Sequence, residues 1–360
     1  MTKLPEALKT NIKNWRFDNL KLGEVSATTV CELDLHATPN QIIIIDGTIV
    51  HAEVPHGVEV STGSKVFPLE PTNSLLELNY QNVNSKIEIK VPKDMVVMDT
   101  LSVVIIAKHR SLIHQTSVVL AKSSAIEIVE SYIGMDEFNA NIVANYFIGE
   151  NANLTLSTIN NLAPSTVVYH HKHADIANDG KLDTTNFIIN DTDLVFEDFA
   201  FLTGRGANAN LKTVAIASGS QKQNLTVRTE NIASNTVGNI VNYGIVKDEA
   251  HLAFNGIGKI QKASKASDNQ QETRLLNLST TAEAVANPFL LIDEGDITAG
   301  HAASIGQLDE EQIYYLMSRG MSRRDASKMI VSGFLTPFVD IVEDVMMKED
   351  LAEKIQTKLV

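Results

Sequence analysis

Four short stretches in the middle of the chain decide the fold. They read ANLTL (152–156), GKLDT (180–184), ANLKT (209–213) and GNIVN (238–242). Each places a small or polar residue just before the first apolar residue of a strand-like run. These apolar residues are Leu154, Leu182, Leu211 and Ile240, and the intervals between them are 28, 29 and 29 residues. A near-constant interval of this size is typical of a repeat architecture.

A second set of strand starts is offset from the first. It comprises TDLVF (192–196), QNLTV (223–227) and AHLAF (250–254), whose leucines are 31 and 27 residues apart. Two strand starts per period predict coils of two strands each, stacked so that their apolar faces form one continuous core. Asn and Gly at the corners favour tight bends because they enter left-handed backbone conformations at low cost. The sequence therefore predicts a β-solenoid, and an ordinary β-sandwich with chance spacing is the alternative.

Strand-like runs begin at about Ser26 and continue to about residue 297, and no long amphipathic helix interrupts residues 100–300. We expect a helical or irregular lead-in over residues 1–25 and a β-strand region over residues 26–306. A small helical domain is expected over residues 307–360. The fold class is thus mainly β with helices at the C-terminal end.

The C-terminal region carries helix start and stop signals. Asp309 with Gln312, and Ser322 with Asp325, are capping pairs. Gly320 ends the first of these helices, and Pro337 is expected to start a third helical segment. We expect this domain to cap the solenoid and to cover its open end, which would otherwise be an exposed edge.

Composition limits the classes of function. Lys and Arg total 30 and Asp and Glu total 44, which gives a net charge of −14. An acidic body disfavours nucleic acid and anionic membrane as partners. The longest apolar runs, such as Ile42–Ile45 and Val103–Ala107, are strand-length, and the N-terminus lacks the apolar core of a secretory signal. We expect a cytoplasmic protein. The single cysteine, Cys31, allows neither a disulfide framework nor a CxxC metal site.

Two motifs suggest ligand chemistry, and each has a structural alternative. In YHHKH (169–173), His171 and His173 share one face of a strand, and zinc would need a third ligand such as Asp175 or Asp179. The alternative is a polar outer face of a solenoid strand. NGIGK (255–259) resembles part of a phosphate loop, but it lacks the full glycine spacing and no helix follows it.

Acidic residues cluster in LLIDEGDI (290–297). Carboxylate pairs on a β-helix occur in polysaccharide lyases and hydrolases, so a carbohydrate-active enzyme is an alternative function. Such enzymes line their grooves with aromatic side chains, and aromatic residues make up only 6% of this chain.

His301 lies among small residues in TAGHAAS (298–304). Its neighbours leave the imidazole accessible and permit close approach of another chain or of a compact inorganic group. The alternative is a hydrogen-bonded structural histidine at an interface.

The stretch that contains this histidine carries a family resemblance. NPFLLIDEGDITAGHAASIGQLDEEQIYYLMSRGM (287–321) is similar to the C-terminal signature of the SufB/SufD family of iron–sulfur cluster assembly proteins, and within it to the SufD branch. The shared features are the proline-led strand, the acidic turn, the small-residue histidine segment and the Tyr-Leu-x-Ser-Arg-Gly helix end. QQETRLLNLS (270–279) and WRFDNLKL (15–22) also resemble family stretches. The likeness covers about residues 13–345.

The resemblance implies an N-terminal helical region, a right-handed parallel β-helix and a C-terminal helical domain. It implies a non-catalytic scaffold subunit of the SufBCD complex, which pairs with SufB through the β-helix and binds the SufC ATPase through the C-terminal helices. A chain studied without SufB is expected to form a homodimer through the same surface. SufB carries the cysteine that receives sulfur, so the lack of a core cysteine here favours SufD.

The resemblance also implies the site residues. The family histidine near the SufB interface corresponds to His301, which becomes a candidate cluster ligand or sulfur-path residue. Some SufD proteins carry a cysteine two positions earlier, where this chain has Ala299. We expect no tightly bound cofactor in the isolated chain and a transient iron–sulfur cluster in the complex. For SufC binding we select Tyr314, Tyr315, Arg319, Gly320, Arg323, Arg324 and Phe334.

Overall fold

The computed structural model describes residues 38–62, 73–108, 111–134, 139–162, 167–341 and 345–359. The expected lead-in over residues 1–25, the stretch 15–22 and Cys31 lie outside the described residues. Strands occupy most of the described chain up to residue 306, and three helices follow them.

The strands form two sheets. The ten-stranded sheet contains, from edge to edge, β19 (Ile297–Gly306), β17 (Ser267–Asn277), β15 (Val237–Val246), β13 (Asn208–Ala217), β11 (Lys181–Ile188), β9 (Asn153–Asn161), β7 (Ala125–Gly134), β5 (Leu101–Ala107), β1 (Gln41–Ile45) and β2 (Thr48–Ala52). The nine-stranded sheet contains β18 (Glu283–Ile292), β16 (His251–Ile260), β14 (Lys222–Asn231), β12 (Asp193–Leu202), β10 (Val167–Ile176), β8 (Ala140–Ile148), β6 (Leu112–Leu120), β4 (Ser85–Val91) and β3 (Glu59–Ser61).

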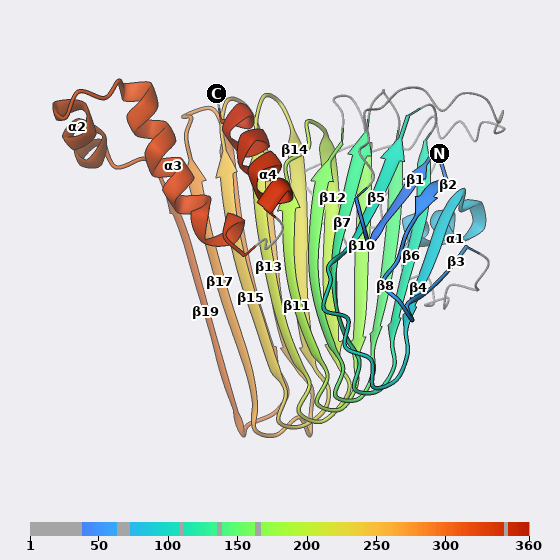
Figure 1. Cartoon of the computed structure of the whole chain (residues 1–360). Helices are drawn as coiled ribbons and strands as arrows, with labels where there is room; N and C mark the ends of the chain where they lie inside the picture. Colours follow the sequence, from blue (N-terminus) through green and yellow to red (C-terminus); the bar gives the residue numbers. More distant parts are fainter. Residues whose placement is uncertain are drawn as a thin grey trace.

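From β4 to β19 the chain alternates between the two sheets, and neighbouring strands within each sheet run parallel. Each coil therefore adds one strand to each sheet, and the stacked coils are visible side by side in Figure 1. The predicted β-solenoid is confirmed, and the β-sandwich alternative is wrong.

The strand register differs by two residues from the predicted alignment. Leu182 pairs with Leu154 as expected, but Leu211 pairs with Thr184 and not with Leu182. In the second set, Gln223 rather than Leu225 is the partner of both Leu194 and Leu252. A shift of two residues keeps a side chain on the same face of a strand, so the apolar residues expected to face inward still do so.

The corners set this register. Asn151, Asp179, Gly206 and Asn235 each lie two residues before β9, β11, β13 or β15, and their φ angles are 54°, 54°, 73° and 59°. Gly, Asn and Asp enter this left-handed region at the lowest cost, which explains the recurrence of these residue types. The corner residues thus mark the repeat more faithfully than the leucines that follow them.

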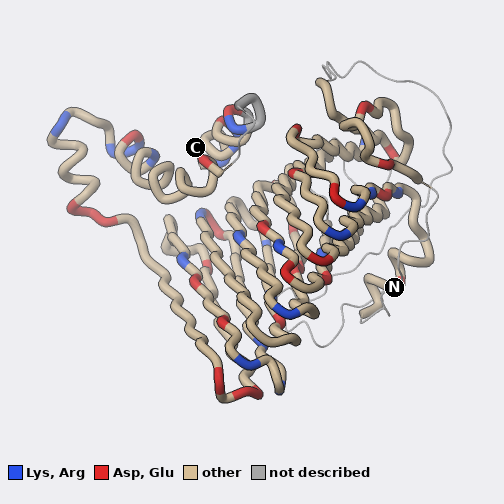
Figure 2. Tube along the Cα trace, turned by 60° about the horizontal axis from the view of Figure 1, so that its bottom comes forward, with Lys and Arg blue, Asp and Glu red and all other residues tan. Residues whose placement is uncertain are grey.

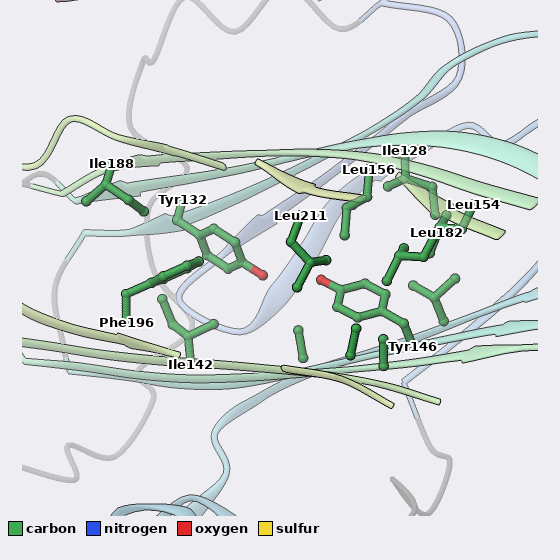
Figure 3. Close-up of a cluster of buried hydrophobic side chains, with 14 of the residues drawn as sticks. Ile128, Tyr132, Ile142, Tyr146, Leu154, Leu156, Leu182, Ile188, Phe196 and Leu211 are labelled. Carbon is green, nitrogen blue, oxygen red and sulfur yellow. The ribbon is translucent and has the colours of Figure 1, made fainter. Parts of the chain in front are cut away.

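Alternating side chains of both sheets point inward and fill the solenoid. Figure 3 shows Ile128, Leu156, Phe196 and Leu211 between the sheets, and all four are buried. Full burial of such a side chain contributes about 1.5–3 kcal/mol, but only where a neighbouring coil covers it. The end coils of the stack therefore leave inward-facing apolar side chains partly exposed, whereas the middle coils bury them.

One helix lies within the region predicted to be strands. In α1 (Ser74–Asn82), the side chain of Asn73 accepts hydrogen bonds from the backbone N–H groups of Leu75 and Leu76, both at 2.9 Å. These two leucines pack on Val143 and Tyr169, on the outer face of the nine-stranded sheet. The sequence does not predict α1, because nine residues form too few turns to distinguish a helical pattern from a strand pattern.

The C-terminal helices are α2 (Glu310–Ser318), α3 (Arg323–Val339) and α4 (Val345–Lys358). Asp309 and Ser322 cap α2 and α3 as predicted, and Gly320 turns the chain between them with a φ of 92°. Pro337 does not start a helix, contrary to expectation. It lies near the end of α3, where its missing N–H removes only a late hydrogen bond.

These helices do not cover the open end of the solenoid, so that expectation is wrong. Val331, Leu335 and Phe338 of α3, with Leu351 and Ile355 of α4, pack on outward-facing residues of the ten-stranded sheet such as Phe187, Val214 and Ile245. Figures 1 and 2 show α3 and α4 over that sheet and α2 projecting past β19. No helix in the described part of the chain is long and apolar enough to span a membrane.

Candidate functional site at the open end of the solenoid

The last strand of each sheet forms an open end. Among the described strands, β18 pairs only with β16 and β19 only with β17. Ile292 and Ile305 continue the inward rows of the buried residues Ile260 and Leu275, yet they are 39% and 50% exposed. Phe289 and Leu291, on the outer face of β18, are 48% and 50% exposed. The outer edges of β18 and β19 also present backbone donors and acceptors to solvent. We call the outer edges of β18 and β19 the open end.

His301 lies in β19 at this end. It pairs in register with Gln271 of β17, which is buried and belongs to the inward-facing row that ends in the core residue Leu275. Neighbours in a parallel pair share a face, so His301 also belongs to the inward row. It is exposed because β19 is the last described strand of its sheet, and no coil of the described chain covers it. The expected accessible histidine is therefore found, at the mouth of the solenoid interior.

The inward face of the ten-stranded sheet carries a row of polar residues that leads toward this mouth. Asn186, Thr213, Asn242 and Thr273 are consecutive register partners in β11, β13, β15 and β17. The amide of Asn186 donates to Thr213 Oγ1 at 3.3 Å, and that of Asn242 donates to Thr273 Oγ1 at 3.3 Å. The interior near His301 is thus more polar than a plain hydrophobic core.

The inner end of this row meets a buried ionic cluster. Lys172 Nζ donates to Thr158 Oγ1 at 3.0 Å and to Asn186 Oδ1 at 2.6 Å, and Asn186 in turn donates to Asp198 Oδ2 at 2.8 Å. Lys172 and Asp198 are both buried, and burial lowers the pKa of the Lys172 ammonium below its ordinary value. Asp198 counteracts this shift because its negative charge favours the protonated lysine.

Glu130 completes this cluster. Its Oε2 accepts hydrogen bonds from the hydroxyls of Tyr132 at 3.2 Å and Tyr146 at 2.9 Å, which point toward one another in Figure 3. Burial raises the pKa of the Glu130 carboxyl, while Lys172 and the two tyrosine hydrogen bonds oppose this shift. This cluster is not among the sites predicted from the sequence; its only signal there is polar residues at inward positions of consecutive strands.

The residues selected for ATPase binding divide into two groups. Tyr314 and Tyr315 are 75% and 57% exposed on α2, and Arg319 and Arg324 are exposed nearby. Arg323 is exposed too but forms an ion pair with Glu310. Gly320 makes the turn described above. Phe334 differs, because its ring packs on Tyr243 of β15 with centroids 4.8 Å apart and so fixes α3 to the solenoid.

Two exposed methionines extend the surface formed by the tyrosines. Met317 of α2 is 42% exposed and Met329 of α3 is 54% exposed. Ala326, one turn before Met329 on α3, is buried, so Met329 lies on the exposed face of that helix. A groove of about 390 Å³ beside Tyr315 is lined by Leu316 and Ile330. We call Tyr314, Tyr315, Met317 and Met329 the helical patch.

The other candidate motifs have structural roles. His171 Nδ1 lies 2.8 Å from Glu197 Oε2 and His173 Nε2 lies 3.3 Å from Asp175 Oδ2, both on the outer face of β10 as predicted. Within the described residues, no group of three or more His, Cys, Asp or Glu side chains could hold a metal ion. NGIGK is part of β16, and its glycines Gly256 and Gly258 face the interior.

The acidic stretch forms the corner between β18 and β19. Glu294 accepts hydrogen bonds from the backbone N–H groups of Ala263 and Gly295, both at 2.9 Å, and these bonds lower the pKa of its carboxyl. A cavity of about 720 Å³ lies beside His301, and its lining contains no aromatic side chain. A sugar-binding groove would need such side chains, so the structure gives the enzyme alternative no support.

Comparison with known proteins shows which family has this architecture. The profile of the family described as "SUF system FeS cluster assembly, SufBD core domain" matches residues 103–334, which span the solenoid from β5 to α3. The chain belongs to the SufBD family. The resemblance drawn from the C-terminal signature is thereby confirmed.

Individual SufBD relatives agree with the profile. The chain is 33% identical to the iron–sulfur cluster assembly protein SufD of Bacillus subtilis over 293 residues, which cover 80% of this chain and 67% of that protein. It is 23% identical to SufD of Escherichia coli over 242 residues, covering 67% and 57%. A SufBD family protein of Mycobacterium leprae is 31% identical over 137 residues, or 38% of this chain and 16% of that protein.

Proposed function

We propose that this chain is the SufD-like, non-catalytic subunit of a SufBCD scaffold on which iron–sulfur clusters are assembled. The family match supports a role in cluster assembly. The observation that carries the proposal is the open end, where both sheets of described strands stop without an edge partner and where His301 lies in the inward row. A partner with the same fold could continue both sheets across this edge.

The open end suits SufB as the partner. Added strands would satisfy the backbone groups of β18 and β19, and the partner's side chains would cover Phe289, Leu291 and Ile305. In the isolated chain these backbone groups and these side chains are in contact with solvent instead. A second copy of this chain offers the same surface, so we expect the isolated protein to form a homodimer through the open end.

His301 would then lie between two solenoids. Iron–sulfur clusters are held mostly by thiolates, and histidine can replace cysteine at an iron. A neutral imidazole nitrogen is an exchangeable ligand, which suits a cluster that has to be passed on. One histidine cannot hold a cluster, so the other ligands come from the SufB side of the interface. The cluster is the cargo of the complex and not a resident group of this chain.

The helical patch suits the SufC ATPase. Exposed Tyr and Met side chains are enriched in protein interfaces, and Arg319 and Arg324 at their margin add specificity. A force applied to α2 reaches α3 and then β15 through the contact of Phe334 with Tyr243. Closure of two ATP-bound SufC copies would thus act on the solenoid close to the open end. Such coupling requires that nucleotide changes the affinity between the subunits.

The test is co-expression of this chain with SufB and SufC, followed by anaerobic purification and assay of iron and sulfide per complex. His301→Ala is compared with His56→Ala, an exposed histidine in the turn after β2, far from the open end. We expect both variants to form the complex and only His301→Ala to lose iron and sulfide. Unchanged iron and sulfide in His301→Ala would contradict a role for this histidine, and failure of the wild-type chain to form a complex would contradict the scaffold function.

A further inference from the structure

Gln271 is the residue beside His301 whose contacts the proposed function does not explain. It is 5% exposed, faces the interior from β17 and is the register partner of His301. Its amide nitrogen donates to the backbone carbonyl of Phe289 in β18 at 2.8 Å. This hydrogen bond joins the two sheets across the interior, immediately inside the open end, and gives the Gln271 side chain a defined direction.

The other half of this amide is its carbonyl oxygen, Oε1. Within the described part of the chain, Gln271 Oε1 is a buried acceptor that receives no hydrogen bond. The nearby amide of Asn242 donates to Thr273 instead. Burial of an unpaired carbonyl oxygen is unfavourable, and native proteins keep such atoms rarely, often at functional sites.

The opposite strand is shaped to accommodate this amide. A Cβ atom on Gly256 of β16 would lie 2.7 Å from Gln271 Oε1, and one on Gly258 would lie 2.6 Å from Gln271 Nε2. Any side chain at these positions would displace the glutamine. Glycine within a strand weakens it and often marks a site where another group approaches the backbone closely. Here that group is the Gln271 amide. The two glycines of NGIGK hold open the space that Gln271 occupies.

We propose that Gln271 is a positioning residue for His301. Its Oε1 accepts the ring N–H of His301 when the partner chain closes the open end, and the other ring nitrogen then presents its lone pair to the cluster. Neighbouring strands lie about 4.8 Å apart, which brings inward side chains in register within reach of one another. Histidine ligands generally use their second nitrogen in this way, which fixes the tautomer and the ring orientation. The inference rests on the proposed function of His301.

The test uses the complex with SufB and SufC and three variants of this chain. Gln271→Met removes the acceptor at nearly constant volume, whereas Gln271→Glu retains an acceptor oxygen. Gln270→Met is the matched control, because Gln270 is the adjacent residue and donates to Asp268 on the outer face. Iron and sulfide per complex, iron affinity and the thermal midpoint are measured for each. We expect Gln271→Met to weaken iron binding about 10-fold and Gln271→Glu to restore it, with the control unchanged.

A merely structural role gives a different pattern. A buried glutamate is less stable than a buried methionine, so iron content would then follow the thermal midpoint, with Gln271→Glu the worse variant. That order would overturn the inference, as would failure of the Gln271→Met complex alone to assemble. Gly256→Ala displaces the same oxygen from the opposite strand and should also lower iron content. If His301→Ala loses iron but Gln271→Met does not, only this inference fails. If His301→Ala keeps iron, the proposed function of His301 itself fails.

Discussion

Phe334 of α3 packs on Tyr243 of β15, with ring centroids 4.8 Å apart, and Phe338 contacts the same tyrosine with centroids 4.6 Å apart. This aromatic contact fastens the C-terminal helices to the outer face of the ten-stranded sheet, two strands away from β19. We therefore expect a partner bound to α2 to act, through α3, on the coils nearest the open end.

Truncation of the tyrosine should loosen the helices. We expect Tyr243→Ala to lower the free energy of unfolding by about 2–3 kcal/mol, because a large partly buried ring is lost from a packed contact. It should also raise the rate of proteolysis within α2 to α4. Chemical denaturation and limited proteolysis measure the two effects. Tyr314→Ala is the control, and its exposed ring should change stability by less than about 0.5 kcal/mol. Equal effects of the two variants would contradict the proposed fastening.

The same exposed tyrosine should matter for binding. We expect Tyr314→Ala and Met329→Asp each to weaken the affinity for SufC about 10-fold or more, since aromatic and apolar anchors dominate interface energetics. Titration calorimetry with purified SufC measures this. Glu349→Ala on α4 is the control, because Glu349 is exposed outside the helical patch. Wild-type affinity for both patch variants would place the SufC site elsewhere on the chain.

The open end should govern self-association. We expect the isolated chain to sediment as a dimer and the double variant Leu291→Glu, Ile305→Glu to sediment as a monomer, because charges would face each other across the edge. Val50→Glu is the control, since Val50 is 42% exposed on β2 at the other end of the stack. Sedimentation velocity at several concentrations distinguishes the species. A dimer that survives the double variant would have to use a different surface.

Two interior histidines should make the protein sensitive to acid. Burial lowers the pKa of His114 to about 3 and that of His170 well below its ordinary value. In the unfolded chain both would bind protons near the ordinary value of about 6.5, so stability is full above that pH and is lost as pH falls below it. Together they should lower the free energy of unfolding by roughly 3 kcal/mol per pH unit at most between about pH 6 and pH 4. Denaturation curves of wild type and of the His114→Asn, His170→Asn variant measure the difference, and an equal slope would refute this assignment.

The buried lysine should be costly to remove alone. We expect Lys172→Met to destabilise the chain by about 3–5 kcal/mol, because Asp198 would remain as a buried charge without its counter-ion. Lys172→Met combined with Asp198→Asn should recover part of that loss. Chemical denaturation of the two variants tests the interaction, and additive losses would show that the two side chains are not coupled.

The repeat was predictable because its corners require a left-handed backbone conformation that few residue types adopt at low cost. Asn151, Asp179, Gly206 and Asn235 occupy left-handed corners that few other residues tolerate, and their recurrence every 27–29 residues reveals the coils. The exact register was not predictable from the leucines. Leu211 and Leu225 look like strand starts, but a two-residue shift leaves the same face inward, so hydrophobicity cannot distinguish the two alignments.

The candidate site was predictable only in part. The small residues around His301 indicated an accessible ring, and the structure places it at the open end. Gln271, the register partner of His301, lies 30 residues away in the sequence, and Gly256, which leaves room for Gln271, lies 45 residues away. No local sequence pattern reveals such contacts. NGIGK resembles a phosphate loop because glycines at that spacing are ambiguous without knowledge of which face of a strand they occupy. The position of the C-terminal helices was likewise undetermined, because an apolar helical face does not indicate which surface it covers.

The central claim is that His301 of this chain touches the cluster. Pulsed electron paramagnetic resonance of the reduced cluster tests it directly, in a SufBCD complex where only this chain carries ¹⁵N-labelled histidine. We expect a ¹⁵N hyperfine coupling that disappears in His301→Ala and persists in His56→Ala. A complex with wild-type cluster content and no histidine nitrogen coupling would contradict the claim.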